Sequence, residues 1–176
     1  MLMQGKKGLI MGVANDRSIA WGIAKSLADN GASIALTYQG EALKKRVEPL
    51  AQSINSDILI PCDVADSLSM ENVFKTLKEK WGQLDFLVHG IGFSNKDELR
   101  GKYYNTTSEN FNQTMHISCY SFTEACKLAE PLMNDGGSIL TLTYYGAEQV
   151  MPHYNVMGVA KAALEASVRY LAVDLG

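Results

Sequence analysis

A tyrosine and a lysine near the end of the sequence have a spacing that suits proton-transfer chemistry. Tyr154 and Lys161 are seven residues apart, which on an α-helix is about two turns and nearly one face, with roughly 10 Å of axial rise between them. A phenol can donate a proton or a hydrogen bond to an oxyanion that develops during a reaction. A nearby ammonium group stabilises the phenolate side of that equilibrium. On these residues alone, a catalytic pair and a partly exposed helix that merely contains both residues are equally open interpretations.

A second group of candidate residues follows the first apolar stretch of the chain, in the segment 12–22. Gly12 can supply a tight turn, and Ser18 is a plausible N-cap with free backbone amides behind it. Such amides bind phosphate groups, although the segment lacks the G-x-G-x-x-G pattern. Gly22 lies inside the expected helix, where glycine costs about 1 kcal/mol against alanine unless close packing on a sheet requires it. Alone, the segment is a weak indication of a nucleotide site.

The elements that must position these residues alternate regularly along the chain. Apolar runs predict strands over 7–12, 33–38, 57–62, 84–90 and 137–143. Helical patterns cover 18–30, a stretch through Leu43, Val47 and Leu50, then 68–81, 108–133 and a last helix from about Tyr154 to the end. Alternating helices and strands that are apolar on both faces predict a parallel sheet covered on each side. Right-handed crossovers then predict a doubly wound α/β fold, the Rossmann fold, with strand order 3-2-1-4-5.

The ends of the expected strands strengthen the nucleotide interpretation, because ligands of such sheets bind beyond the carboxyl ends of the strands. Gln39 stands where an acidic residue normally holds the ribose 2′-hydroxyl; it offers no positive charge to a 2′-phosphate, which favours NAD over NADP. Asp63 and Val64 offer an acceptor and an apolar wall where an adenine could lie. Ile91 is flanked by two glycines that let backbone approach a ribose or nicotinamide. Each position could be ordinary turn chemistry, but four consecutive strand ends together favour a dinucleotide site.

Composition narrows the class of protein further. The hydrophobic content of 47% and charged content of 20% are ordinary for one globular domain, which we expect over 1–176. A net charge of −3 with scattered basic residues gives no case for nucleic acid. No apolar stretch suits a signal peptide or a membrane span. Cys62, Cys119 and Cys126 form no CxxC pair, so we expect no metal site and reduced thiols in a cytoplasmic protein.

The spacing of the tyrosines and the lysine carries a more specific resemblance. The chain resembles the short-chain dehydrogenase/reductase superfamily, and within it the divergent enoyl-acyl carrier protein reductases of bacterial type II fatty acid synthesis. Ordinary members of the superfamily have Tyr-x3-Lys, but the residue four before Lys161 is Met157, which has no acidic proton. The enoyl reductases instead have Tyr-x6-Lys and a second tyrosine ten residues earlier, which Tyr154, Lys161 and Tyr144 match. The segments 12–14, 37–39, 62–64, 91–93 and 154–162 match as well, so the resemblance covers essentially the whole chain.

This resemblance implies NADH-dependent reduction of the trans-2 double bond of an enoyl thioester carried by acyl carrier protein. Hydride would pass from the nicotinamide C4 to the β-carbon, Tyr154 would hydrogen-bond the thioester carbonyl as it becomes an enolate, and Lys161 would hold the nicotinamide ribose. Tyr144 would line the substrate pocket, and Ser94 falls where the family contacts substrate through its backbone. The expected cofactor-binding residues are Gly12, Ser18, Ile19, Gln39, Asp63, Val64, Ile91 and Lys161.

The resemblance also implies a homotetramer in which the helices beginning near Ser108 and Tyr154 pack between subunits. Gly90 and Tyr145 depart from the residues usual in the family, and neither change removes a proposed catalytic group. Family members continue with a sixth and a seventh strand and a helical lid. We therefore expect this chain to be C-terminally incomplete, part of a protein of roughly 260 residues.

Two other functions remain open at this stage. One is an NAD(P)-dependent carbonyl or hydroxyl dehydrogenase of the same superfamily, against which Met157 argues. The other is a non-catalytic nucleotide-binding fragment, which the expected missing segment favours and the retained Tyr144, Tyr154 and Lys161 oppose.

Overall fold

A computed structural model describes residues 1–133 and 136–176, with Asn134 and Asp135 falling inside the range of one strand. The chain divides into two compact units. Unit 1 comprises Met1–Gly90 and Lys127–Thr141, and unit 2 comprises Ile91–Cys126 and Leu142–Gly176. That both belong to one domain over 1–176 stays a prediction.

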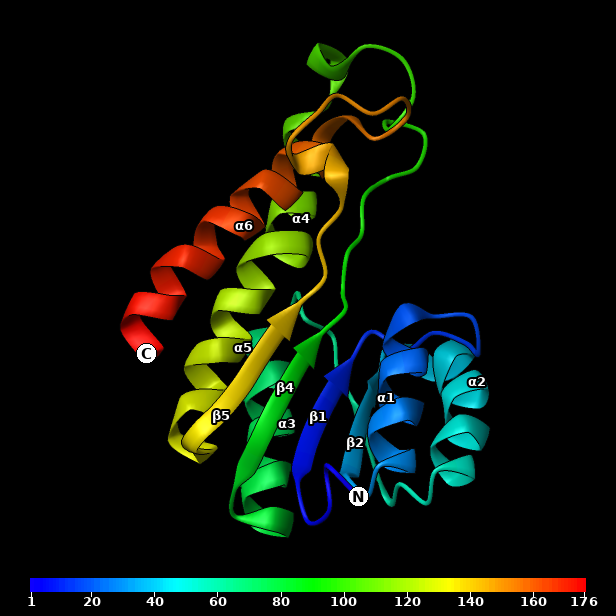
Figure 1. Cartoon of the computed structure of the whole chain (residues 1–176). Coiled ribbons are helices and arrows are strands. Elements are labelled where there is room, and N and C mark those ends of the chain that lie inside the picture. The colour runs from blue at the N-terminus through cyan, green and yellow to red at the C-terminus, as the bar shows by residue number, and fades with distance from the viewer. The chain divides into compact units, whose positions relative to one another are not determined.

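Unit 1 is built on a parallel sheet of five strands in the order β3-β2-β1-β4-β5, which confirms the predicted order (Figure 1). The strands are β1 (Lys7–Met11), β2 (Ser33–Tyr38), β3 (Ile58–Pro61), β4 (Leu84–His89) and β5 (Met133–Thr141). The reversal of strand order falls between β1, which pairs with β2 on one side, and β4 on the other. This reversal is the point at which doubly wound sheets bind ligands.

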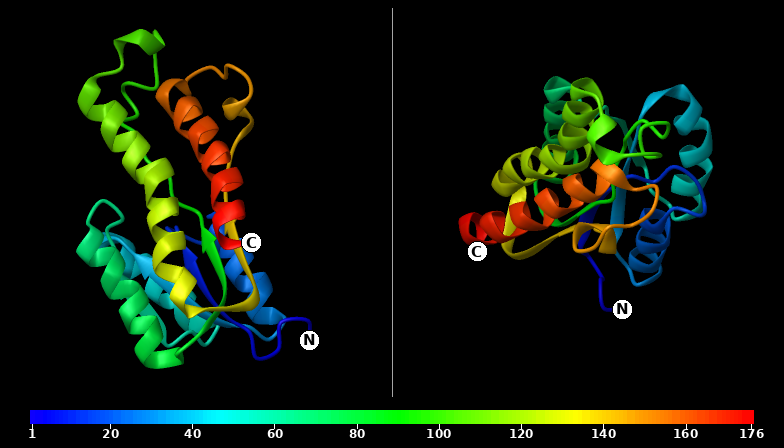
Figure 2. Two further views of the ribbon diagram at one scale, coloured as in Figure 1. Left: turned by 90° about the vertical axis from the view of Figure 1, so that its left-hand side faces the viewer. Right: turned by 90° about the horizontal axis from the view of Figure 1, so that it is seen from above.

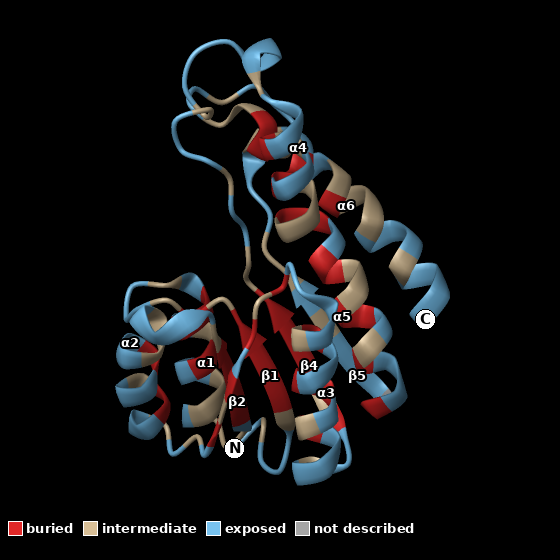
Figure 3. Cartoon of the chain, turned by 180° about the vertical axis from the view of Figure 1, so that it is seen from behind, coloured by how far each residue is buried: buried red, intermediate tan, exposed pale blue. Residues whose placement is uncertain are grey.

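Three helices of unit 1 cover the sheet. They are α1 (Ile19–Asp29), α2 (Gly40–Ser53) and α3 (Ser67–Trp81). Helices α1 and α2 lie on one face and α3 on the other (Figures 1 and 3). Helix α3 is bounded by strong local signals, because Asp66 accepts a hydrogen bond from the Leu68 amide at its start and Gly82 takes the left-handed conformation (φ 72°) at its end.

The central strands form the core of unit 1 (Figure 3). Leu9, Ile10 and Met11 of β1 are fully buried, as a strand covered by helices on both faces requires. Position 8, just before these residues, requires glycine, because a Cβ there would overlap the ring of Phe86 on β4.

Unit 2 is largely helical. Its elements are the 3₁₀ turn η1 (Tyr103–Asn105), α4 (Ser108–Met115), the π-helical turn η2 (His116–Tyr120), the 3₁₀ turn η4 (Tyr145–Ala147) and α6 (Asn155–Leu175). Helix α6 runs beside α4 and η2 (Figure 2). Its start confirms the last predicted helix to within one residue, which is the usual precision of helix ends.

The single helix predicted over 108–133 is wrong in two respects. The π turn η2 interrupts it, and it ends at Ala129, where α5 (Ser121–Ala129) gives way to the 3₁₀ turn η3 (Glu130–Leu132). Pro131 explains the end, because proline has no amide hydrogen to continue an α-helix. Strand β5 accordingly begins at Met133 rather than 137, with an irregular register opposite Leu84–Phe86.

Candidate active site

The segment after β1 in unit 1 is shaped by Gly12 and Ser18. Gly12 has a φ of 99°, and a Cβ there would overlap the carbonyl oxygen of Gly90, so only glycine fits. Ser18 occupies the N-cap position of α1, but its side chain makes no capping hydrogen bond. Its Oγ instead accepts hydrogen bonds from the amides of Ala14 (3.0 Å) and Asn15 (3.1 Å). Ser18 thus stands at the predicted N-cap position, but its hydroxyl holds the preceding loop in place and does not cap the helix amides.

The start of α1 suits an anion. No acidic residue lies in its first turn, and within the described residues the amides of Ile19 and Ala20 donate to no acceptor. Unpaired amides at a helix start carry partial positive charge and bind phosphate groups. Ile19 itself is 70% exposed, so its side chain contributes little to the core.

The remaining predicted residues of unit 1 lie at the ends of β2 and β3. Gln39 is the exposed N-cap residue of α2 and makes no capping hydrogen bond with its side chain. The amide of Asp63 donates to Ser69 Oγ (2.9 Å), and a carboxylate oxygen of Asp63 accepts from the Ala65 amide (2.9 Å). Val64 is buried. These hydrogen bonds fix the turn after β3. The Gln39 side chain, in contrast, is exposed and accessible to a ligand.

In unit 2, Tyr154 is positioned at the N-cap of α6 against a second tyrosine. The rings of Tyr154 and Tyr144 meet edge to face, with centroids 4.8 Å apart and planes at 67°. The carbonyl of Tyr154 accepts the amide hydrogen of Met157 (2.9 Å), which fixes its backbone to the helix. Burial raises the pKa of Tyr154 above its ordinary value, and the neighbouring Tyr144 raises it further. The phenol is therefore a proton and hydrogen-bond donor at neutral pH rather than a phenolate.

Two glycines make room for the Tyr154 ring. A Cβ on Gly146 in η4 would overlap that ring. A Cβ on Gly158 in α6 would lie 2.7 Å from the carbonyl oxygen of Gly146, closer than real Cβ atoms approach an oxygen. The close approach of η4 and α6, and hence the seat of Tyr154, depends on both glycines.

Lys161 lies two helical turns beyond Tyr154 and is 8% exposed. Its Nζ donates a hydrogen bond to the carbonyl oxygen of Leu142 (2.8 Å) and lies 3.7 Å from where a Cβ of Gly92 would be. Burial lowers the pKa of Lys161, and the thiol of Cys119 partly opposes this. Within the described residues no hydrogen bond joins Lys161 to Tyr154, so each side chain is held by its own neighbours.

The loop after β4 contains Ile91 and Ser94, and its anchors were missed in the sequence. The hydroxyl of Ser94 bonds Thr114 Oγ1 (2.8 Å) and Asn110 Nδ2 (3.2 Å), so it faces α4. Ser118 in η2 bonds the backbone of Phe93, the residue before Ser94. Asn110, Thr114 and Ser118 are buried and spaced by four. Polar residues at helical spacing on a buried face are a sequence signal that could have found them.

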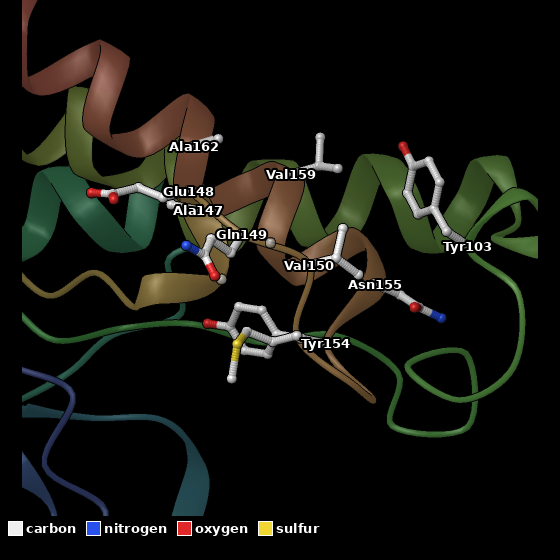
Figure 4. Close-up of a pocket in the computed structure, with 12 residues that line it drawn as sticks. Tyr103, Ala147, Glu148, Gln149, Val150, Tyr154, Asn155, Val159 and Ala162 are labelled. Atoms are coloured by element: carbon white, nitrogen blue, oxygen red, sulfur yellow. The ribbon is translucent and has the colours of Figure 1, made fainter.

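A cavity of about 330 Å³ borders Tyr154 within unit 2 (Figure 4). This volume is at the lower end of the range for small-molecule sites. The wall is mostly apolar and is formed by η4, the segment that follows it and the first turns of α6. Its lining residues are Tyr103, Gly146, Ala147, Glu148, Gln149, Val150, Met151, Tyr154, Asn155, Gly158, Val159 and Ala162. Among the described residues, no cluster of His, Cys, Asp and Glu could hold a metal ion, and no helix is long and apolar enough to cross a membrane.

The parallel sheet of order 3-2-1-4-5 defines a Rossmann fold, and Tyr154 and the buried Lys161 follow its last strand along the chain, at the start of α6. Residues 12–176 match the family model described as enoyl-(acyl carrier protein) reductase. The chain belongs to this family.

Relatives with established names agree with this assignment. The chain is 69% identical over 175 residues to enoyl-[acyl-carrier-protein] reductase [NADH] 1 of Rhizobium meliloti (strain 1021), covering 99% of this chain and 64% of that protein. It is 59% identical to the enoyl-[acyl-carrier-protein] reductase [NADH] FabI of Rickettsia typhi, covering 99% of this chain and 67% of that protein. The chain thus spans about two thirds of the length of these relatives, and slightly less for the Rhizobium protein.

Solved structures agree as closely. The enoyl-(acyl-carrier-protein) reductase of Anaplasma phagocytophilum, determined in complex with NAD, superposes with a TM-score of 0.97 at 64% identity, covering 100% of this chain and 67% of that one. The Bacillus cereus enoyl-acyl carrier protein reductase with NADP+ and indole naphthyridinone gives a TM-score of 0.97 at 47% identity, covering 99% and 69%.

Proposed function

We propose that the protein reduces the trans-2 double bond of enoyl thioesters on acyl carrier protein, using NADH, in the last reductive step of fatty acid elongation. The observation that carries this proposal is the seating of Tyr154, a protonated phenol packed against Tyr144, seven residues before the buried Lys161. The names of the relatives, which specify enoyl-[acyl-carrier-protein] and NADH, support the same reaction.

NADH, when bound, supplies the hydride that adds to the β-carbon of the substrate. The π electrons of the double bond then move toward the thioester carbonyl, whose oxygen becomes that of an enolate. Tyr154 donates a hydrogen bond to this oxygen as its negative charge develops, and its raised pKa favours the protonated phenol that such a bond requires. A proton from solvent water then adds to the α-carbon, leaving hydroxide to the bulk solvent, and the thioester carbonyl re-forms.

Residues of unit 1 are proposed to bind the cofactor. Unit 1 supplies the open start of α1 for the pyrophosphate, next to Gly12, Ser18 and Ile19. Gln39 holds the adenine ribose without attracting a 2′-phosphate, and Asp63 and Val64 flank the adenine. These assignments stay proposals, as does the preference for NADH over NADPH.

Unit 2 supplies the groups proposed for the nicotinamide and the substrate. Lys161 holds the nicotinamide ribose beside Ile91 and Gly92, where the missing side chain of Gly92 leaves space. Ser94 contacts substrate through its backbone, because its hydroxyl is already bonded to α4. Tyr144 lines the substrate side of Tyr154.

We also propose acyl carrier protein as the partner that delivers the substrate, a homotetramer as the assembly, and the cytoplasm as the location. Exposed apolar side chains on α6, such as Val159 (37% exposed) and Tyr170 (79% exposed), support an assembly through this helix.

Oxidation of NADH by crotonyl and acetoacetyl thioesters tests the reaction, with protein produced from the complete gene. We expect turnover with the crotonyl substrate and a loss of about a hundredfold or more in kcat for Tyr154→Phe, because the hydrogen bond to the enolate oxygen is lost. Turnover of the acetoacetyl substrate alone would indicate a carbonyl dehydrogenase, against which the buried Met157 at the usual tyrosine position argues. NADH binding without turnover, unchanged by Tyr154→Phe and Lys161→Ala, would indicate a nucleotide-binding module.

A further inference from the structure

A buried polar stripe runs along α4 and η2 on the side that faces the loop after β4. It consists of Asn110, Thr114 and Ser118, which are 4%, 0% and 0% exposed. Burial of a polar side chain is costly unless its hydrogen bonds are satisfied. The bonds of this stripe therefore identify what it is built to hold.

Ser118 holds the backbone of Phe93 in both directions. Its Oγ accepts the amide hydrogen of Phe93 (2.9 Å) and donates to the carbonyl oxygen of the same residue (3.0 Å). A hydroxyl has one donor and two acceptor sites, so both bonds can form at once. One side chain thus satisfies both backbone groups of a loop residue that belongs to no helix or strand.

Asn110 and Thr114 hold the next two residues of the loop. Asn110 Oδ1 accepts the amide hydrogen of Asn95 (2.9 Å), and Thr114 Oγ1 lies 2.8 Å from the hydroxyl of Ser94. The loop residues that Asn110 and Thr114 hold thus lie beyond Phe93, beginning with Ser94. Ser118 alone in the stripe bonds the residue that follows Gly92.

The contacts around Gly92 connect Ser118 to the proposed site. A Cβ placed on Gly92 would lie 3.7 Å from Lys161 Nζ and 3.8 Å from Ser118 Oγ. Two side chains from different helices therefore approach the same backbone position. Ser118 is also the middle residue of the π turn η2, and π turns inside helices are frequent at functional sites.

We propose that Ser118 is a positioning residue for the reduction: by bonding both backbone groups of Phe93, it fixes the Gly92 backbone beside the Lys161 ammonium group. This inference rests on the proposed function. Displacement of the Gly92–Phe93 backbone shifts the place available to the nicotinamide ribose relative to Lys161. Because hydride transfer requires aligned reacting atoms, small displacements reduce the rate more than they reduce binding.

The matched comparison is between Ser118→Ala and Thr114→Val, two fully buried hydroxyls one turn apart on the same stripe. Both variants lose a hydroxyl, but only Ser118→Ala releases Phe93. We expect Ser118→Ala to lower kcat by about tenfold or more with KM little changed. We expect Thr114→Val to lower stability to a similar degree with a smaller loss of kcat. Ser53→Ala serves as a further control, because that hydroxyl bonds the Leu50 carbonyl within its own helix α2 (2.7 Å).

Amide hydrogen exchange in the absence of cofactor tests the contact independently of activity. In Ser118→Ala the Phe93 amide should exchange faster, whereas the Asn95 amide, held by Asn110, should keep its protection. Unchanged exchange at Phe93, or equal losses of kcat in Ser118→Ala and Thr114→Val, would overturn the positioning role. A wild-type protein that fails to reduce crotonyl thioester would instead overturn the proposed function, while the exchange data would still decide whether Ser118 holds the loop.

Discussion

Burial acts on the two proposed catalytic side chains in opposite directions. It raises the pKa of the Tyr154 phenol and lowers the pKa of the Lys161 ammonium group, because in each case it disfavours the charged form. The phenol is consequently kept protonated, as a hydrogen-bond donor must be. Charging the lysine carries a desolvation cost, which the hydrogen bond from its Nζ to the Leu142 carbonyl partly offsets.

The pH dependence of stability should reveal this cost at Lys161. Because its pKa is lowered in the folded state, the unfolded chain binds more protons between that lowered pKa and the ordinary value of 10.5. The contribution of Lys161 to the free energy of unfolding therefore rises as pH rises through this alkaline window. We expect Lys161→Met to remove that rise, measured by denaturant unfolding at a series of alkaline pH values.

The control for this measurement is Lys75→Met, which removes an exposed lysine. Tyr154 has the opposite effect on the pH dependence of stability, because its pKa is raised in the folded state and its contribution is lost as pH rises through that pKa. The two effects overlap in one curve, so the pH profiles of the variants are compared with one another. A pH profile of Lys161→Met that parallels the wild type would show that burial does not perturb this lysine.

At the scale of elements, two glycines in helices have opposite surroundings. Gly22 in α1 has no atom within 4 Å of where a Cβ would lie, whereas a Cβ on Gly158 in α6 would meet the Gly146 carbonyl at 2.7 Å. Close packing on the sheet, the one condition under which a helix would need glycine at position 22, is thus not found within the described residues. In the sequence the two positions look alike, because each is a glycine inside a helical pattern.

We therefore expect Gly22→Ala to stabilise the protein by about 0.5–1 kcal/mol, since alanine loses less backbone entropy and nothing must move. Gly158→Ala should be destabilising, because backbone of η4 must shift. Thermal unfolding of both variants, with Tyr fluorescence or NMR of Tyr154 as a local probe, measures the contrast. Destabilisation by Gly22→Ala would mean that α1 packs closely against a group outside this chain.

How far the sequence predicts the elements depends on which interaction decides each one. The sheet order followed from apolar strands and crossover handedness, and these same forces determine it in the structure. The end of the helix over 108–133 was mispredicted because Pro131 matters more than apolar periodicity, and the periodicity holds no signal for the π turn at Ser118. Ser18 was assigned to a cap because its backbone position is that of a cap, and its actual bonds to residues 14 and 15 depend on the path of the loop.

At the scale of the whole molecule, the groups proposed for the adenine end of the cofactor belong to unit 1, and Tyr144, Tyr154 and Lys161 belong to unit 2. The exposed apolar residues of α6 are relevant here, because helices that pack between subunits present such residues at helical spacing.

Assembly through α6 can be tested at Tyr170, which is 79% exposed. If this face packs against another subunit, a carboxylate there would be buried without a partner, and we expect Tyr170→Glu to shift the protein from tetramer to smaller species. Light scattering after size-exclusion chromatography measures the shift. Glu148→Gln, on a segment outside α6, is the control, and an unchanged mass for Tyr170→Glu would exclude this face from the interface.

The interlocking of Gly146, Gly158 and the Tyr154 ring also bears on how such a site can evolve. Gly146 and Gly158 have no side chain that could be shortened, and the space around them does not admit a larger residue. A substitution at either glycine therefore disrupts the packing and cannot adjust it gradually. The position of the Tyr154 phenol is consequently expected to stay the same as the site evolves. Variation in what the site accepts has to come from positions with room to change, such as Tyr144 and the fully exposed Val150 at the edge of the cavity.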